Sequence, residues 1–188
     1  MKYISERESI VSIGQLLWDK DLVSGFNGNI SLRVDDEHVL MTASGACLGR
    51  LSSRGIVLVA IDGGVIEGGE PTSERLLHLD IYRNFPAIKA VVHTHTPCTN
   101  AFFLNNKVFR PKTFEAEHVL GEVHGVDQAG VNVTDTAPVI DKLRVNTIVA
   151  LRRHGIVAVG DTLFQGFTRI QVLEEQLWVE ALGKLYNS

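Results

Sequence analysis

The stretch AIKAVVHTHTP, residues 87–97, holds the signals that decide the fold. Residues 87–94 are mostly apolar and predict a buried strand. Thr96-Pro97 then has the form of a helix start, with an N-cap threonine and proline in the first helical position, and a short helix through residues 101–104 should follow. A strand that runs directly into a helix predicts a domain in which helices cover a sheet.

Apolar residues at helical spacing predict further helices before and after this stretch. The pattern Ser5-x-x-Glu8 is a capping box, and it predicts a first helix that ends near Leu22. A second helix should begin after residues 71–73 and end before Pro86. Two more are expected at about residues 137–144 and about residues 162–185.

Alternating apolar residues predict strands that pair mainly with their neighbours in sequence. They are expected at residues 29–34, 38–42, 56–61, 65–66, 147–151 and 156–159. Asp62-Gly63-Gly64 supplies the turn of one hairpin. These elements predict an α/β layered domain with a mixed or largely antiparallel sheet. No Gly-x-Gly-x-x-Gly follows a strand, which excludes a doubly wound nucleotide-binding fold.

The composition fits one globular domain over residues 1–188, because 45% hydrophobic residues suffice for a sizeable core. The 18 Lys and Arg against 22 Asp and Glu give a net charge of −4 without a basic patch, so nucleic acid is not expected as a partner. The apolar runs are far shorter than the ~20 residues of a spanning helix, so no membrane is expected. The N-terminal residues lack the pattern of a signal peptide, and we expect a cytoplasmic location. Cys47 and Cys98 suggest neither a disulfide nor a zinc site.

The strongest chemical signal is the His-Thr-His motif at residues 93–95, at the end of a predicted strand. Residues two apart on a strand face the same side, so both imidazoles can reach one metal ion, although a simple pair near a sheet edge explains the motif equally well. Further ligand candidates are Glu74 and His154, which complete a set suited to zinc or a similar divalent ion. His78 is a weaker candidate, because its spacing from Glu74 is more typical of a solvated helix contact.

Three small polar turns form a second set of candidates, at residues 27–31, 42–45 and 71–73. Each can present backbone N–H groups and short hydroxyl or amide donors. The third lies at a helix N-terminus, where the helix dipole favours an anion. Singly, each is more readily a turn or a helix cap, but beside a metal-ligand set the three together predict a phosphate site.

These motifs, at residues 28–31, 42–45, 71–74, 93–97 and 154–155, resemble those of the class II aldolase/adducin family in order and approximate spacing. The similarity is greatest to its short sugar-phosphate aldolases, typified by L-fuculose-1-phosphate aldolase. It implies a three-layer α/β/α domain with a central, mainly antiparallel sheet, one Zn²⁺ per subunit, and a homotetramer with active sites between subunits. The implied metal ligands are Glu74, His93, His95 and His154, and the implied phosphate-binding residues are Gly28, Asn29, Ser44, Gly45, Thr72 and Ser73.

The resemblance also implies a reaction, the reversible cleavage of a small ketose phosphate to dihydroxyacetone phosphate and an aldehyde. Zinc would act as a Lewis acid without a Schiff-base lysine, and Glu74 would both ligate zinc and move a proton. The catalytic tyrosine of the fuculose-phosphate enzymes corresponds by spacing to Phe114. An acidic neighbour would then replace it, and we favour Glu115 over Glu117.

Other activities of the superfamily are alternatives. A ribulose-5-phosphate 4-epimerase is the runner-up, although those enzymes have Asp rather than Glu at the position of Glu74 and a longer C-terminus. Dehydratase or decarboxylase activity would use the same metal and proton chemistry. A non-catalytic scaffold, as in adducin heads, is disfavoured because all four ligand candidates are present.

Overall fold

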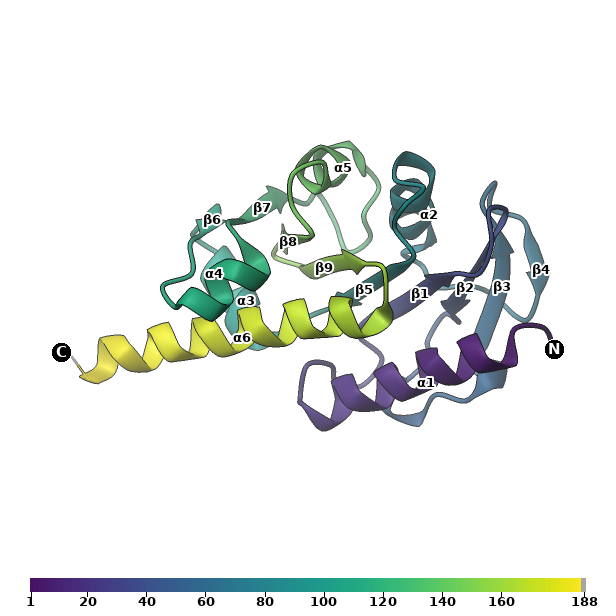
Figure 1. Ribbon diagram of the computed structural model, residues 1–188, viewed down its shortest axis with the longest axis horizontal. Helices are drawn as coiled ribbons and strands as arrows, with labels where there is room; N and C mark the ends of the chain where they lie inside the picture. Colours follow the sequence, from purple (N-terminus) through teal and green to yellow (C-terminus); the bar gives the residue numbers. More distant parts are fainter. Residues whose placement is uncertain (187–188) are drawn as a thin grey trace.

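Residues 1–186, which the computed structural model describes, form three layers around one sheet of nine strands (Figure 1). The strand order is β4-β3-β2-β1-β5-β9-β8-β7-β6, and all neighbours are antiparallel except β7 and β8. The strands are β1 (Asn29–Arg33), β2 (His38–Thr42), β3 (Ile56–Ala60), β4 (Val65–Glu67), β5 (Ala90–Thr94), β6 (Val108–Phe109), β7 (Val123–Asp127), β8 (Ile148–Arg152) and β9 (Gly155–Gly160). The predicted fold class is therefore confirmed.

Helices cover both faces of the sheet and enclose two separate cores. One face carries α1 (Ile4–Asp19), α3 (Pro97–Phe103), α4 (Phe114–Leu120) and α6 (Leu163–Tyr186), and the other carries α2 (Arg75–Asn84) and α5 (Ala137–Leu143). Strand residues alternate between the cores. In β5, Ala90 and Val92 pack into the first core and Val91 into the second. Every helix within residues 1–186 falls short of the length or apolarity needed to cross a membrane.

The first helix differs from its prediction at both ends. It begins at Ile4 and ends at Asp19, so Ser5 lies inside it and donates its hydroxyl to Glu6 Oε2 at 3.0 Å. The prediction that Ser5 and Glu8 form a capping box was therefore wrong. Tyr3, in the left-handed conformation, occupies the N-cap position, and its hydroxyl donates to Asp35 Oδ2 at 2.6 Å. This tertiary contact, absent from any local pattern, sets where the helix begins.

Residues 105–136, which carry no regular pattern, contain the two-residue β6, the short α4 and the parallel strand β7. β7 includes Gly125, where a Cβ would lie 2.8 Å from Phe103 Cδ1. The close contact with Phe103 requires glycine at this position, and glycine weakens the sequence pattern by which a strand is predicted.

The expected helix start at Thr96-Pro97 is confirmed in position, but the threonine side chain makes no capping hydrogen bond. Instead, the carboxylate of Glu174 on α6 accepts the backbone N–H groups of Cys98 at 2.7 Å and Thr99 at 2.9 Å. A negative charge at a helix N-terminus is favourable. This contact fixes the chain immediately after the His-Thr-His motif to the longest helix.

Candidate active site

Two adjacent strands bring three histidines together. β5 pairs with β9, with Thr94 opposite Ile156, so the end of β5 lies beside the turn that precedes β9. The ring centroids of His93, His95 and His154 are 4.8 to 5.0 Å apart. One ligand atom from each lies within 4.8 Å of the others. We call these three residues the histidine cluster, and its arrangement indicates a divalent metal site.

Gly155 allows β9 to approach the histidine rings. A Cβ at this position would lie 2.3 Å from Thr94 O and 2.9 Å from His95 Cδ2. Two residues earlier, Arg153 has a φ of 63°, in the left-handed region, and the chain turns sharply there. The glycine after His154 is therefore a steric requirement of the cluster.

Burial keeps the histidine cluster uncharged. Burial, reinforced by the neighbouring imidazoles, lowers the pKa of His93 well below its usual 6.5 and that of His95 to about 4. Burial also lowers the pKa of His154. Neutral imidazole is the form that binds a metal ion.

The nitrogens of the cluster have lone pairs to offer. His93 Nδ1 donates to the Ile156 carbonyl at 2.9 Å, which leaves Nε2 as an acceptor, 2.9 Å from His95 Nε2. Within residues 1–186, His154 Nδ1 is buried and has no hydrogen-bond partner. Donation of Nδ1–H to a carbonyl is the usual way in which a ligating histidine is oriented. The donor set therefore fits a divalent ion.

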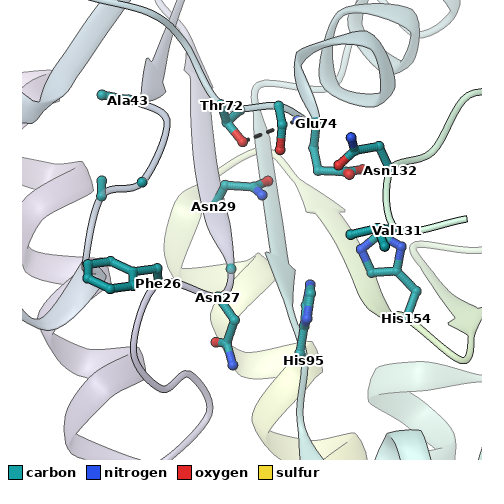
Figure 2. Close-up of a pocket in the computed structure, with 14 residues that line it drawn as sticks. Phe26, Asn27, Asn29, Ala43, Thr72, Glu74, His95, Val131, Asn132 and His154 are labelled. Atoms are coloured by element: carbon teal, nitrogen blue, oxygen red, sulfur yellow. Dashed lines mark hydrogen bonds between the residues drawn. The ribbon is translucent and has the colours of Figure 1, made fainter.

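Glu74 lines the same cavity from the N-cap position of α2 (Figure 2). Its side chain is buried, and Oε2 accepts the Val133 N–H at 3.4 Å. Burial raises the pKa of this carboxyl above its usual 4.5, and the Val133 N–H partly opposes the shift. Among residues 1–186, the set of ligand atoms within 4.8 Å of one another contains the three histidines and not Glu74. Glu74 thus faces the cavity beside the cluster as a carboxyl with raised proton affinity.

All three polar turns contribute to this cavity. It combines Gly28, Asn29, Gly45, Thr72 and Ser73 with Glu74, His95 and His154. Ser44 is outside this lining, and its backbone N–H donates to Glu70 O at 2.9 Å. Gly28 has a φ of 81°, and a Cβ there would lie 3.0 Å from His93 O. The turn at Gly28 is therefore held directly against the strand that carries His93.

Comparison with known proteins agrees with this arrangement. The family model for the class II aldolase and adducin N-terminal domain matches residues 8–180. The chain belongs to the class II aldolase and adducin family. This membership confirms the resemblance found in the sequence motifs.

Relatives of this class II aldolase-family chain include two kinds of enzyme. It is 38% identical to the L-fuculose phosphate aldolase of Methanococcus vannielii over 89% of this chain and 91% of that protein. It is 32% identical to the 3-oxo-tetronate 4-phosphate decarboxylase of Escherichia coli K12, over 91% and 84%. The crystal structure of L-fuculose-1-phosphate aldolase from Thermus thermophilus superposes with a TM-score of 0.87 at 28% identity, covering 96% of this chain and 95% of that one.

Two further residues of the predicted turns, Asn27 and Ala43, line the class II aldolase-family cavity, together with residues that sequence reasoning missed. Asn27 belongs to the first turn, and its side chain binds Ser24, with Oδ1 accepting the backbone N–H at 2.9 Å and Nδ2 donating to Oγ at 3.0 Å. Val131 and Asn132 come from the irregular segment between β7 and α5, which offers no sequence signal. The remaining missed residues are Phe26 and Ala46.

His78 is wholly buried in this class II aldolase-family fold, so its interpretation as a solvated helix contact was wrong. Its Nε2 lies 2.5 Å from Asn29 Oδ1, and its Nδ1 lies 2.6 Å from Ser31 Oγ, which is 2.9 Å from the Tyr82 hydroxyl. We call Asn29, His78, Ser31 and Tyr82 the buried relay. Burial lowers the pKa of His78 to about 3. The face of α2 that carries His78, which its spacing from Glu74 predicted to be exposed to solvent, packs against polar residues of β1.

Glu115 and Glu117 lie on the exposed surface of α4, and neither lines the cavity of its own chain in this class II aldolase-family structure. The neighbouring Phe114 is 93% exposed. A role for Glu115 therefore stays a prediction that depends on a second subunit.

Proposed function

We propose that this chain is a zinc-dependent aldolase that reversibly cleaves a small ketose phosphate, similar to L-fuculose 1-phosphate, to dihydroxyacetone phosphate and an aldehyde. The observation that carries the proposal is one cavity lined by His95 and His154 of the uncharged histidine cluster and by the polar turns around Gly28 and Thr72. A metal on one side and N–H donors on the other match a substrate with a carbonyl and a phosphate.

His93, His95 and His154 would hold the metal ion, with Glu74 as a fourth ligand. A bound Zn²⁺ would supply Lewis acidity toward the substrate carbonyl and hydroxyl oxygens. Glu74 would take the proton from, and return it to, the carbon beside the carbonyl. Its burial and raised pKa support this role, because a general acid/base works best with a pKa near the working pH.

The phosphate would bind at Gly28, Asn29, Ser44, Gly45, Thr72 and Ser73. Thr72 Oγ1 already accepts the Glu74 N–H at 3.3 Å, so this turn places the phosphate donors and the proton carrier on one short segment.

We propose a homotetramer in which Glu115 of one subunit reaches the cavity of another and serves as the acid near the aldehyde oxygen. The exposure of Glu115 and its place outside the lining of its own cavity support an intersubunit role. We also propose a cytoplasmic location.

A phosphorylated 3-oxo acid is the second candidate substrate, because one group of relatives consists of 3-oxo-tetronate 4-phosphate decarboxylases. Decarboxylation also breaks a carbon–carbon bond near a carbonyl and leaves a carbanion that needs the same stabilisation and protonation. The epimerase, dehydratase and scaffold alternatives have no comparable support.

The test combines elemental analysis of the purified protein with two product assays. Dihydroxyacetone phosphate would be measured over a panel of ketose 1-phosphates, and carbon dioxide over 3-oxo acid phosphates. Zinc near one per chain with dihydroxyacetone phosphate release supports the aldolase. Zinc with carbon dioxide release alone replaces it with the decarboxylase, and a metal-free, inactive protein contradicts both. Chelator treatment followed by zinc addition is the control for metal dependence.

A further inference from the structure

The buried relay begins at Asn29, in the cavity, and continues through three buried side chains that have no role in the proposed reaction. Asn29 lines the cavity and is 7% exposed, while Ser31 and His78 are 0% exposed and Tyr82 is 1% exposed. Asn29 and Ser31 lie two apart on β1 and so face the same side, and His78 and Tyr82 lie four apart on α2. One strand and one helix therefore supply alternate members of the relay.

The donor and acceptor groups assign a direction to these hydrogen bonds. The Tyr82 hydroxyl lies 2.9 Å from Ser31 Oγ, a contact in which either oxygen can donate, and it can also donate to Lys89 O at 3.4 Å. Asn29 Oδ1 can only accept, so His78 Nε2 is the donor in that contact, and Nδ1 of the neutral ring accepts the Ser31 hydroxyl. His78, neutral in its buried site, then carries its proton on Nε2 and donates it to Asn29 Oδ1.

We propose that His78 is a positioning residue that, through this relay, holds the carboxamide of Asn29 with Nδ2 toward the cavity as a donor to an anionic oxygen of the substrate. With the opposite relay direction, Asn29 would present Oδ1, whose lone pairs repel an anion. The identity of that substrate rests on the proposed function, but the direction of the relay does not.

The position of Asn29 makes its orientation consequential. In the sheet register Asn29 lies opposite His93, so the amide and the histidine cluster are on neighbouring strands. Glu74 lies one helical turn before His78 on the chain, at the start of α2. The same helix therefore carries the proposed proton carrier and the residue that orients the amide.

The first test is independent of any substrate. Nitrogen-15 NMR of the zinc-loaded protein distinguishes the two neutral histidine tautomers, and the His78→Gln variant assigns the signal. We expect His78 to be protonated on Nε2. Protonation on Nδ1 would overturn the relay direction while leaving the aldolase proposal intact.

The second test measures the binding of inorganic phosphate to the zinc-loaded protein by phosphorus NMR. His78→Leu should weaken binding roughly 10-fold, as expected for a lost hydrogen bond to a charged group. His78→Gln should restore most of it, because its amide can donate from near the position of Nε2. Ser31→Ala, the smallest change, should weaken binding a few-fold and guards against misfolding of the leucine variant.

A double-mutant cycle separates positioning from general structural damage. In the Asn29→Ala background, His78→Leu should cause no further loss of phosphate binding. An equal loss in both backgrounds would overturn the proposal, and so would a wild type that binds no phosphate. A wild type that binds phosphate through Asn29 and cleaves no ketose phosphate would overturn the proposed function alone.

Discussion

The histidine cluster and the buried relay meet at the neighbouring strands β5 and β1, and each contains a wholly buried histidine, yet they differ in how their nitrogens are used. Nε2 of His93 faces the ring nitrogen of another histidine. Both nitrogens of His78 instead pair with other polar side chains: Nδ1 with the Ser31 hydroxyl and Nε2 with the Asn29 carboxamide oxygen. Burial alone therefore does not distinguish a ligand from a structural histidine. Ring nitrogens that face one another indicate a metal site, and an imidazole whose two nitrogens pair with other polar groups indicates a positioning role.

The largest expected effect comes from breaking the cluster. His95→Ala removes a nitrogen whose hydrogen-bond contact in the fold is His93 Nε2 at 2.9 Å, a fellow member of the cluster, so zinc binding should be lost while the secondary structure stays intact. Loss of a Lewis-acid contribution of several kcal/mol should lower kcat by roughly 10³-fold or more. Elemental analysis, circular dichroism and the product assay measure the three quantities.

The control for that variant is His38→Ala, which changes a histidine at the start of β2 whose Nδ1 pairs with Asp35 at 2.8 Å. It should retain zinc and turnover. Full activity in His95→Ala would show that the cluster is not the metal site.

Glu74→Gln should slow the proton step by roughly 10² or more, because the amide cannot accept the proton. Binding of dihydroxyacetone phosphate should change little. Steady-state kinetics and calorimetry separate the two effects, and elemental analysis shows how far the zinc ligand set depends on this carboxylate.

Glu70→Gln is the matched control, since Glu70 is exposed and paired with Arg75 at 3.3 Å. Equal turnover in Glu74→Gln and the wild type would remove Glu74 from the mechanism.

Gly155→Ala tests whether the close approach of β9 shapes the cluster. The added Cβ would collide with Thr94 O, so the free energy of unfolding should fall by about 1–3 kcal/mol and zinc should bind more weakly. Gly69→Ala, where a Cβ meets nothing within 4 Å, should leave both unchanged. Urea unfolding and zinc titration compare the variants, and identical results for both would contradict the steric argument.

Much of this arrangement could be predicted from sequence because its signals are local. His93 and His95 end an apolar stretch that predicts a strand, and the His154-Gly155 pair is one of the motifs that carry the family resemblance. Most strands and the long helices could be predicted for the same reason, because apolar residues recur along each of them at a spacing typical of that element.

The rest depends on contacts between distant segments. Nothing near His78 reveals that Asn29 and Ser31, almost fifty residues earlier, supply its partners. Likewise, Val131 and Asn132 reach the cavity from an irregular segment without periodicity. Helix spacing gives the face on which a residue lies, but only tertiary packing decides what that face meets.

The pH dependence of stability compares the two regions directly. The pKa of His78 is lowered to about 3 by burial, so the unfolded chain binds a proton that the folded chain does not as pH falls below about 6.5. This contribution to stability is complete above pH 6.5 and is lost progressively on acidification toward pH 3. In metal-free protein, His78→Gln should therefore flatten the fall in unfolding free energy by about 1.4 kcal/mol per pH unit between pH 6 and pH 4.

His95→Gln, at a group whose pKa is lowered to about 4, should flatten the same curve in metal-free protein. Added zinc then separates the two variants, because a ligand that binds only the folded state raises its stability. Zinc should raise the Tm of His78→Gln as it does that of the wild type, and should leave the Tm of His95→Gln nearly unchanged. An equal response of both variants to zinc would mean that the relay histidine and the cluster histidine are not functionally distinct.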